Sequence, residues 1–119
     1  MAGTVLLIDD EPEIADLVGD WLELLGTQVT LAARFEEALA AAMTERPRAV
    51  LLDISLGEED GLDLLPRLLE APALAQVPVV VFSVHISRRR EALALGAAAF
   101  VPKPFRGADL LAAVQPYLD

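Results

Sequence analysis

The sequence has no cysteine, a single histidine and few basic residues, and each scarcity excludes a class of site. Without cysteine there is no disulfide and no thiolate metal site, as expected of a cytoplasmic protein. Hydrophobic residues make up 55% of the chain, yet no unbroken apolar run approaches the roughly 18–20 residues of a membrane helix. The opening MAGTVLLIDDE turns acidic without a basic region, so we expect no signal peptide.

Basic residues are outnumbered by acidic ones, 9 against 19, which gives a net charge of −10. Such a chain repels a phosphate backbone, so we expect no direct contact with nucleic acid. Basic proteins and metal cations are the expected partners. The length of 119 residues predicts one domain, residues 1–119, built around a single core.

Short apolar runs alternate with segments of helical spacing, which predicts five βα units. The strands are expected at residues 4–8, 28–31, 49–53, 77–82 and 98–101. The helices are expected at residues 13–25, 35–43, 63–69, 87–95 and 106–118. Two polar-leaning strands suit the edges of a sheet and three apolar strands its interior, which favours the order 2-1-3-4-5. The predicted fold is therefore α/β, a doubly wound, flavodoxin-like parallel sheet with helices on both faces.

Local signals refine two of these helices. Pro66 indicates that the third helix either begins close to Asp63 or is kinked. Ser87 is predicted to cap the fourth helix. Residues 54–60, acidic and containing glycine, are expected to form a loop, and the acids at 58–60 to be solvated.

Four of the apolar runs lead into reactive side chains. The central run AVLLD ends in Asp53, the first strand leads into Asp9 and Asp10, the fourth into Ser83, and the fifth reaches Lys103. The carboxyl ends of parallel strands meet at one edge of a sheet, so these groups are expected to lie together. Strand five lies about 10 Å from strand three, and a lysine stem can cross most of that gap.

Three crowded carboxylates repel unless cations join them. Lys103 and one divalent ion balance three negative charges, and Mg²⁺ selects carboxylate oxygens. That balance favours an ionised Asp53, the form a nucleophile requires. The metal, Lys103 and Ser83 can hold an arriving phosphoryl group, so an acyl phosphate on Asp53 is predicted, with Ser83 drawn towards it as a switch.

Four motifs in order carry a family resemblance: VLLIDDE, VLLDISLGEEDG, VVVFS and GAAAFVPKPF. Together they resemble a response-regulator receiver domain of two-component signalling, over essentially the whole chain. The proposed strand order rests partly on that resemblance. The resemblance implies that Asp53 is the phosphoacceptor, that Asp9 and Asp10 serve Mg²⁺, and that the backbone carbonyl of Ser55 is a further metal ligand.

The resemblance also implies roles on the fourth and fifth strands. Ser83 matches the switch hydroxyl, Lys103 the phosphoryl-binding lysine and Phe100 the switch aromatic, although a core aromatic beside a sheet is the plainer interpretation of Phe100. The peptide bond between Lys103 and Pro104 is commonly cis in the family. Ser55 and His85 occupy positions that influence how fast water attacks the phosphoryl group. For His85 a solvated loop histidine remains the alternative.

The implied function is a phosphorelay receiver that takes a phosphoryl group from a sensor histidine kinase and switches an output partner. Its chemistry would be self-catalysed phosphorylation and dephosphorylation, not that of a metabolic enzyme. One alternative is a receiver-like interaction module that acts without phosphorylation. A phosphohydrolase is disfavoured because the residues after Asp53 lack a second acid, and a flavodoxin because two acids follow the first strand instead of a phosphate-cradling loop.

Three departures from the family pattern bear on the partner face. Gly57 stands where a proline is usual, Val84 where alanine is usual, and the span 83–96 is about two residues short. The run Arg88, Arg89 and Arg90 falls where the fourth helix should begin. It is either a solvated charge cluster or a contact for an acidic partner or for the second subunit of a phosphorylation-dependent dimer.

Overall fold

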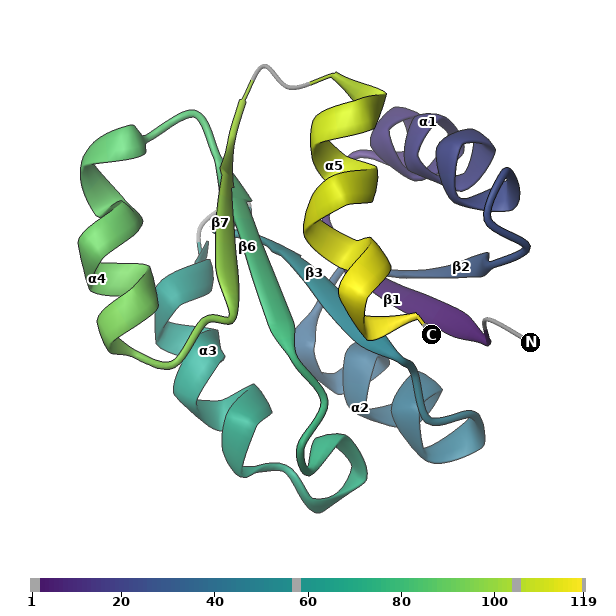
Figure 1. Cartoon of the computed structure of the whole chain (residues 1–119). Coiled ribbons are helices and arrows are strands. Elements are labelled where there is room, and N and C mark those ends of the chain that lie inside the picture. Colours follow the sequence, from purple (N-terminus) through teal and green to yellow (C-terminus); the bar gives the residue numbers. More distant parts are fainter. Residues whose placement is uncertain (1–2, 57–58, 104–105, 119) are drawn as a thin grey trace.

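The computed structural model describes residues 3–56, 59–103 and 106–118, and its centre is a five-stranded parallel sheet (Figure 1). Its strands are β1 (Thr4–Ile8), β2 (Gln28–Ala32), β3 (Ala49–Asp53), β6 (Val79–Ser83) and β7 (Ala99–Pro102). They lie in the order β2-β1-β3-β6-β7 with every pair parallel. The predicted order 2-1-3-4-5 is therefore confirmed.

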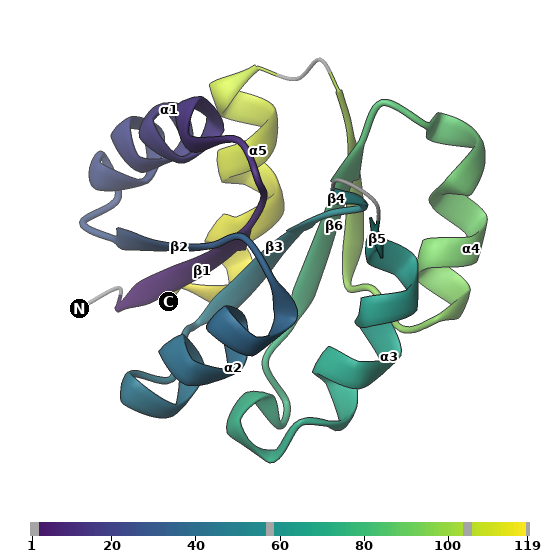
Figure 2. The ribbon, with the colours of Figure 1, turned by 180° about the vertical axis from the view of Figure 1, so that it is seen from behind.

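Helices cover both faces of this sheet (Figures 1 and 2). One face carries α1 (Pro12–Glu23) and α5 (Gly107–Val114), and the other carries α2 (Phe35–Thr44), α3 (Gly61–Glu70) and α4 (Arg89–Ala94). Three short 3₁₀ turns are η1 (Pro72–Leu74), η2 (Ile86–Arg88) and η3 (Gln115–Tyr117). Within the described ranges, no helix combines the length and apolar character needed to cross a bilayer.

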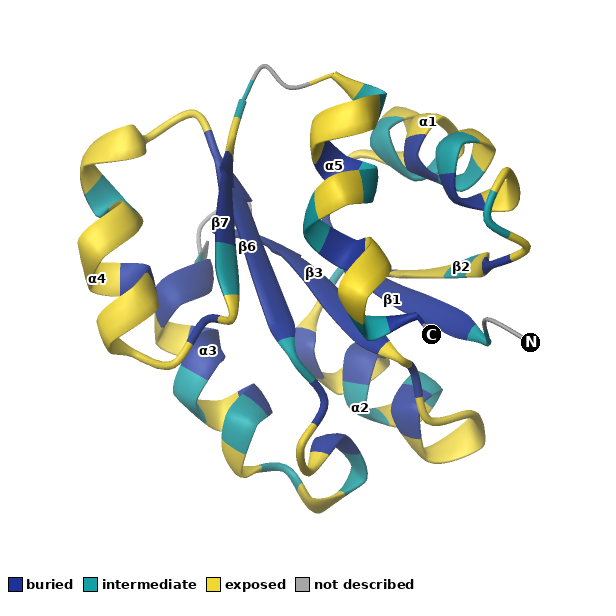
Figure 3. Cartoon of the chain, viewed as in Figure 1, coloured by how far each residue is buried: buried dark blue, intermediate teal, exposed yellow. Residues whose placement is uncertain are grey.

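Two hydrophobic clusters flank the sheet, and the alternation of strand side chains assigns residues to them. Leu6 and Leu52 face α2, α3 and α4, whereas Leu7 and Leu51 face α1 and α5. The inner strands β1, β3 and β6 are buried along their whole length, while β2 is largely exposed (Figure 3). This burial matches the apolar runs from which the strands were predicted.

The segment after β3 departs from the prediction of a loop. Two short strands, β4 (Ser55–Leu56) and β5 (Glu59–Asp60), pair antiparallel there. Strands of two residues are too short to produce a period of hydrophobicity, so no sequence pattern predicts them.

The third helix begins at Gly61, earlier than the predicted start near Asp63, and it contains Pro66. The carboxylate of Asp60 accepts a hydrogen bond from the Leu62 N–H at 3.0 Å and so acts as the N-cap. The expectation that Asp60 is only a solvated loop acid was therefore wrong.

The fourth helix starts at Arg89 and has six residues, which agrees with the short span between β6 and β7. The prediction that Ser87 caps it was wrong. A 3₁₀ turn precedes the helix instead, and no described residue caps either element with its side chain. The positive charges of Arg88, Arg89 and Arg90 lie at the N-terminal end of this helix and oppose its dipole, which agrees with a short helix.

Candidate functional site

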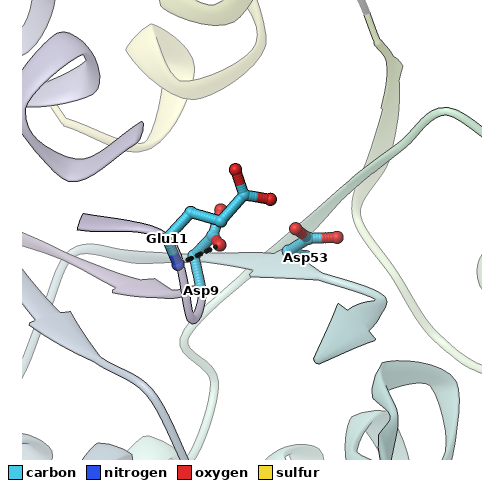
Figure 4. Close-up of side chains that lie close together, drawn as sticks. All are labelled: Asp9, Glu11 and Asp53. Atoms are coloured by element: carbon cyan, nitrogen blue, oxygen red, sulfur yellow. Dashed lines mark hydrogen bonds between the residues drawn. The ribbon is translucent and has the colours of Figure 1, made fainter. Parts of the chain in front are cut away.

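Three carboxylates converge at the carboxyl ends of β1 and β3 (Figure 4). Asp9, Glu11 and Asp53 each offer an oxygen, and these oxygens all lie within 4.8 Å of one another. Ile8 lies opposite Leu52 in the parallel ladder, so the residues that follow them emerge side by side. Asp9 is 0% exposed and Asp53 2% exposed, whereas Glu11 is exposed.

Asp53 is held through both of its carboxylate oxygens. Lys103 Nζ donates to Oδ2 at 3.0 Å, and the backbone N–H of Ser55 donates to Oδ1 at 2.9 Å. The lysine stem passes the neighbouring strand β6, and Nζ lies 4.6 Å from the centre of the Phe82 ring. The structure therefore brings together the carboxylate of the third strand and the ammonium that follows the fifth strand.

Asp9 is the fully buried member of the acidic group that follows β1. Its Oδ1 accepts a hydrogen bond from the Glu11 N–H at 2.9 Å, and its buried Oδ2 has no hydrogen-bond partner within the described part of the chain. Burial raises the pKa of Asp9 to about 6; that hydrogen bond and Lys103 oppose the rise, and Asp53 adds to it. An unpaired buried oxygen beside two further carboxylates suits a hard divalent cation such as Mg²⁺.

Asp10, which the sequence paired with Asp9, is exposed and lies outside this group of three. Glu11 occupies the third place instead, a role that the sequence motifs did not predict. The Asp9 carboxylate accepts from the N–H two residues later, a local turn that short acidic side chains favour. No spacing in the sequence distinguishes Glu11 from Asp10 as the third acid.

The switch candidates lie on the strands beyond Asp53. The hydroxyl of Ser83, 1% exposed, accepts a hydrogen bond from the His85 N–H at 2.9 Å and makes none to Asp53 within the described part of the chain. Phe100 is 8% exposed and belongs to the cluster on the α2, α3 and α4 face. The residues His85, Ser55 and Val84 are all exposed.

Arg88 has structural partners that the sequence did not predict. It donates to Asp60 at 2.9 Å and pairs with Glu91 at 3.2 Å. The hydrogen bond from Arg88 is the main cause that holds the pKa of Asp60 below its ordinary value. Because Arg88 is paired with these two acids, the interpretation of the whole run as a solvated cluster was wrong for Arg88. Arg89 and Arg90 are exposed.

Two sequence expectations fall outside the described residues. These are the effect of Gly57 on the loop after Asp53 and the cis peptide bond between Lys103 and Pro104.

A family model described as the response regulator receiver domain matches residues 5–115. An uncharacterized 14.6 kDa protein of Leptolyngbya boryana is 31% identical over 115 residues, covering 95% of this chain and 88% of that protein. The probable transcriptional regulatory protein TcrX of Mycobacterium tuberculosis is 38% identical over 86% of this chain and 44% of its own length. The chain spans about half or less of the transcriptional regulators it matches.

Solved structures share the fold over nearly the whole of this chain. Chemotaxis protein CheY4 of Vibrio cholerae superposes with a TM-score of 0.87 at 26% identity, covering 99% of this chain and 100% of that one. The receiver domain of sensor histidine kinase PA1611 of Pseudomonas aeruginosa gives a TM-score of 0.82 at 26% identity, with 99% and 98% covered. That structure holds a magnesium ion coordinated in the active site cleft. Because the family match runs through nearly all of the sequence and agrees with the strand order, this chain belongs to the response regulator receiver domains, the phosphoacceptor signalling domains of two-component systems.

Proposed function

We propose that this chain, as a single receiver domain over residues 1–119, accepts a phosphoryl group on Asp53 from a sensor histidine kinase. One observation carries the proposal: Asp53, 2% exposed, lies 3.0 Å from Lys103 Nζ and among the carboxylates of Asp9 and Glu11. Aspartate is almost never fully buried unless it is paired, and a buried carboxylate with a specific charge partner marks a candidate functional site.

In the proposed step an oxygen of Asp53 attacks the phosphorus of a phosphohistidine. The new O–P bond forms as the P–N bond to the donor imidazole breaks, and the electron pair leaves with that nitrogen. The Lys103 ammonium is already fixed beside the nucleophile, where it can offset the charge of the phosphoryl oxygens without reorganising. The Ser55 N–H fixes the orientation of the carboxylate.

The proposed magnesium ligands are the carboxylates of Asp9 and Asp53 and the backbone carbonyl of Ser55, with Glu11 or Asp10 as the further acid. The unpaired Oδ2 of Asp9 supports this assignment. The magnesium ion in the PA1611 receiver domain supports it by similarity. When bound, Mg²⁺ supplies positive charge that neutralises phosphoryl oxygens during transfer.

We propose that Ser83 and Phe100 form the switch. The Ser83 hydroxyl is engaged by the His85 N–H and would exchange that bond for one to the phosphoryl group. Val81 lies opposite Phe100 in the ladder between β6 and β7, so a shift at Ser83 reaches the aromatic ring through one strand pair. Exposed Arg89 and Arg90 would then contact the output partner or the second subunit of a phosphorylation-dependent dimer.

Incubation with acetyl phosphate and Mg²⁺, followed by intact mass measurement, tests the proposal. We expect an adduct of one phosphoryl group that hydroxylamine removes and that EDTA prevents. Asp53→Asn should abolish it, whereas Asp63→Asn, at an exposed acid of α3, should not. A folded, magnesium-saturated sample that forms no adduct would favour the phosphorylation-independent interaction module instead.

A further inference from the structure

A groove of about 660 Å³ lies between α1 and the edge strand β2, apart from the acidic site. Figure 2 shows β2 as the outermost strand of the sheet, with α1 packed beside it. Acidic residues of α1 form one wall, and Val29 and Leu31 of β2 belong to the other. Asp9, Asp53 and Lys103 are not among the residues that line it.

The open edge of β2 presents backbone groups ready for another strand. Gln28 N–H donates to Gly3 O at 3.3 Å, and Ala32 O accepts from Asp9 N–H at 3.0 Å, so these residues face β1. In a parallel pair the intervening residues alternate, which turns the N–H and C=O groups of Val29 and Leu31 away from β1. In the described sheet β2 pairs only with β1, so these groups lie along an open edge.

The α1 wall carries a row of acids that form no salt bridge with the described residues. Asp16, Asp20 and Glu23 are all exposed, line the groove and follow one another at helical spacing. The helix contains no basic residue, and the first one in the chain is Arg34. Like charges four residues apart destabilise a helix, and an acid in its last turn opposes the dipole. The row therefore does not stabilise α1 itself.

Two further residues of the groove, Gly19 and Thr27, have features that packing within this chain does not explain. Gly19 lies inside α1, where glycine weakens a helix, yet a Cβ added there would meet nothing within 4 Å. Thr27 is 2% exposed, and its hydroxyl has no hydrogen-bond partner in the described part of the chain. Open space beside a glycine and an unpaired buried hydroxyl both suit a groove that receives another chain.

We propose that this groove binds an extended basic segment of a partner protein, which adds to β2 as a sixth strand. Its backbone would pair with Val29 and Leu31, and lysine or arginine at alternate positions would face Asp16, Asp20 and Glu23. A second copy of this chain would bring the same acids against one another, and lipid headgroups or nucleic acid would add negative charge. The proposal is independent of phosphoryl transfer at Asp53.

Fluorescence anisotropy with a labelled peptide, acetyl-Lys-Val-Lys-Val-Lys-Val-amide, tests the charge requirement. The variant with Asp16→Asn, Asp20→Asn and Glu23→Gln should bind the peptide about tenfold more weakly, because three partly solvated ion pairs are lost. The matched control neutralises three exposed acids elsewhere: Glu36→Gln, Glu45→Gln and Glu70→Gln. Equal affinity for both variants, or equal binding of a Glu-Val peptide, would overturn the proposal.

Hydrogen exchange tests the strand addition on the unaltered protein. The amides of Val29 and Leu31 should gain protection when the Lys-Val peptide is bound. Leu31→Pro should weaken binding about tenfold, because it removes one outward N–H while sparing the ladder to β1. Peptide binding that leaves both amides unprotected would show attraction by charge alone and would refute the proposal, whether or not the proline variant folds.

Discussion

The ammonium of Lys103 lies 3.0 Å from the Asp53 carboxylate and 4.6 Å from the centre of the Phe82 ring, so one cation is fixed by a charge and by an aromatic face. The lysine side chain is 17% exposed and the aspartate 2%. The pair is therefore largely desolvated, and removing one member leaves the other without compensation.

Lys103→Met keeps the length of the stem and removes the charge. We expect the free energy of unfolding to fall by about 2 kcal/mol, less than the full cost for a buried pair because the lysine is partly solvated. Phosphorylation by acetyl phosphate should slow by a factor of about ten or more. Urea unfolding and intact mass at timed points measure the two effects.

The double variant Lys103→Met with Asp53→Asn provides the control for stability. Because neither position 53 nor position 103 then carries a charge, it should recover most of the lost unfolding free energy. A double variant as unstable as Lys103→Met would mean that the methylene packing of the lysine, and not its charge, is what stabilises the site.

The position of Glu11 predicts an asymmetry between the acids after β1. Glu11→Gln should raise the dissociation constant for Mg²⁺ about tenfold, because it removes a carboxylate from the group of three. Asp10→Asn, at an exposed acid outside that group, should change it by no more than about threefold. Isothermal titration calorimetry measures the Mg²⁺ dissociation constant of each variant. The reverse order would restore Asp10 as the ligand that the family resemblance implies.

The raised pKa of Asp9 predicts how metal-free stability depends on pH. Its pKa is about 6 in the folded protein against an ordinary 3.8, so the folded state binds this proton more tightly. The stability that protonation contributes is complete below about pH 4 and is lost as pH rises through about 6. The loss amounts to about 3 kcal/mol, from 1.36 kcal/mol per pKa unit.

Asp9→Asn should remove this dependence. In EDTA its unfolding free energy should exceed that of the parent by up to about 3 kcal/mol more at neutral pH than at about pH 4. Urea titrations of both proteins across that range give the difference directly. A difference that stays constant with pH would mean that Asp9 ionises normally in the folded chain.

The fold could be predicted because its signals are local and strong. Three strands buried on both faces appear in sequence as uninterrupted apolar runs, and each ends where a polar side chain enters the site. Glu11 could not be chosen over Asp10 from spacing alone, since the grouping of its carboxylate with those of Asp9 and Asp53 depends on the local turn of the chain after β1. The pair of Asp60 and Arg88 joins residues 28 apart in sequence, which no local pattern records.

The link between Asp60 and Arg88 joins the segment after the phosphoacceptor to the segment after Ser83. The two side chains are 38% and 28% exposed, so a double-mutant cycle with Asp60→Asn and Arg88→Ala should give a coupling of only about 0.5 kcal/mol. Asp60→Ala should lose about 1 kcal/mol more than Asp60→Asn, because it also removes the cap of α3. Arg89→Ala, at an exposed neighbour, is the control and should have no effect beyond about 0.5 kcal/mol.

Gly61 is the point where α3 approaches the back of the phosphoacceptor strand. A Cβ there would meet Ile54 Cα and lie 2.7 Å from Asp53 O, both backbone atoms that cannot rotate away. Gly61→Ala should therefore destabilise the protein by about 1–3 kcal/mol and slow phosphorylation, because relief of the clash displaces Asp53. Gly19→Ala, inside α1 with open space around it, should instead stabilise by about 0.5–1 kcal/mol. Thermal unfolding and acetyl phosphate labelling of the two variants would distinguish the stabilisation of a helix by alanine from the effect of a clash with the backbone at Asp53.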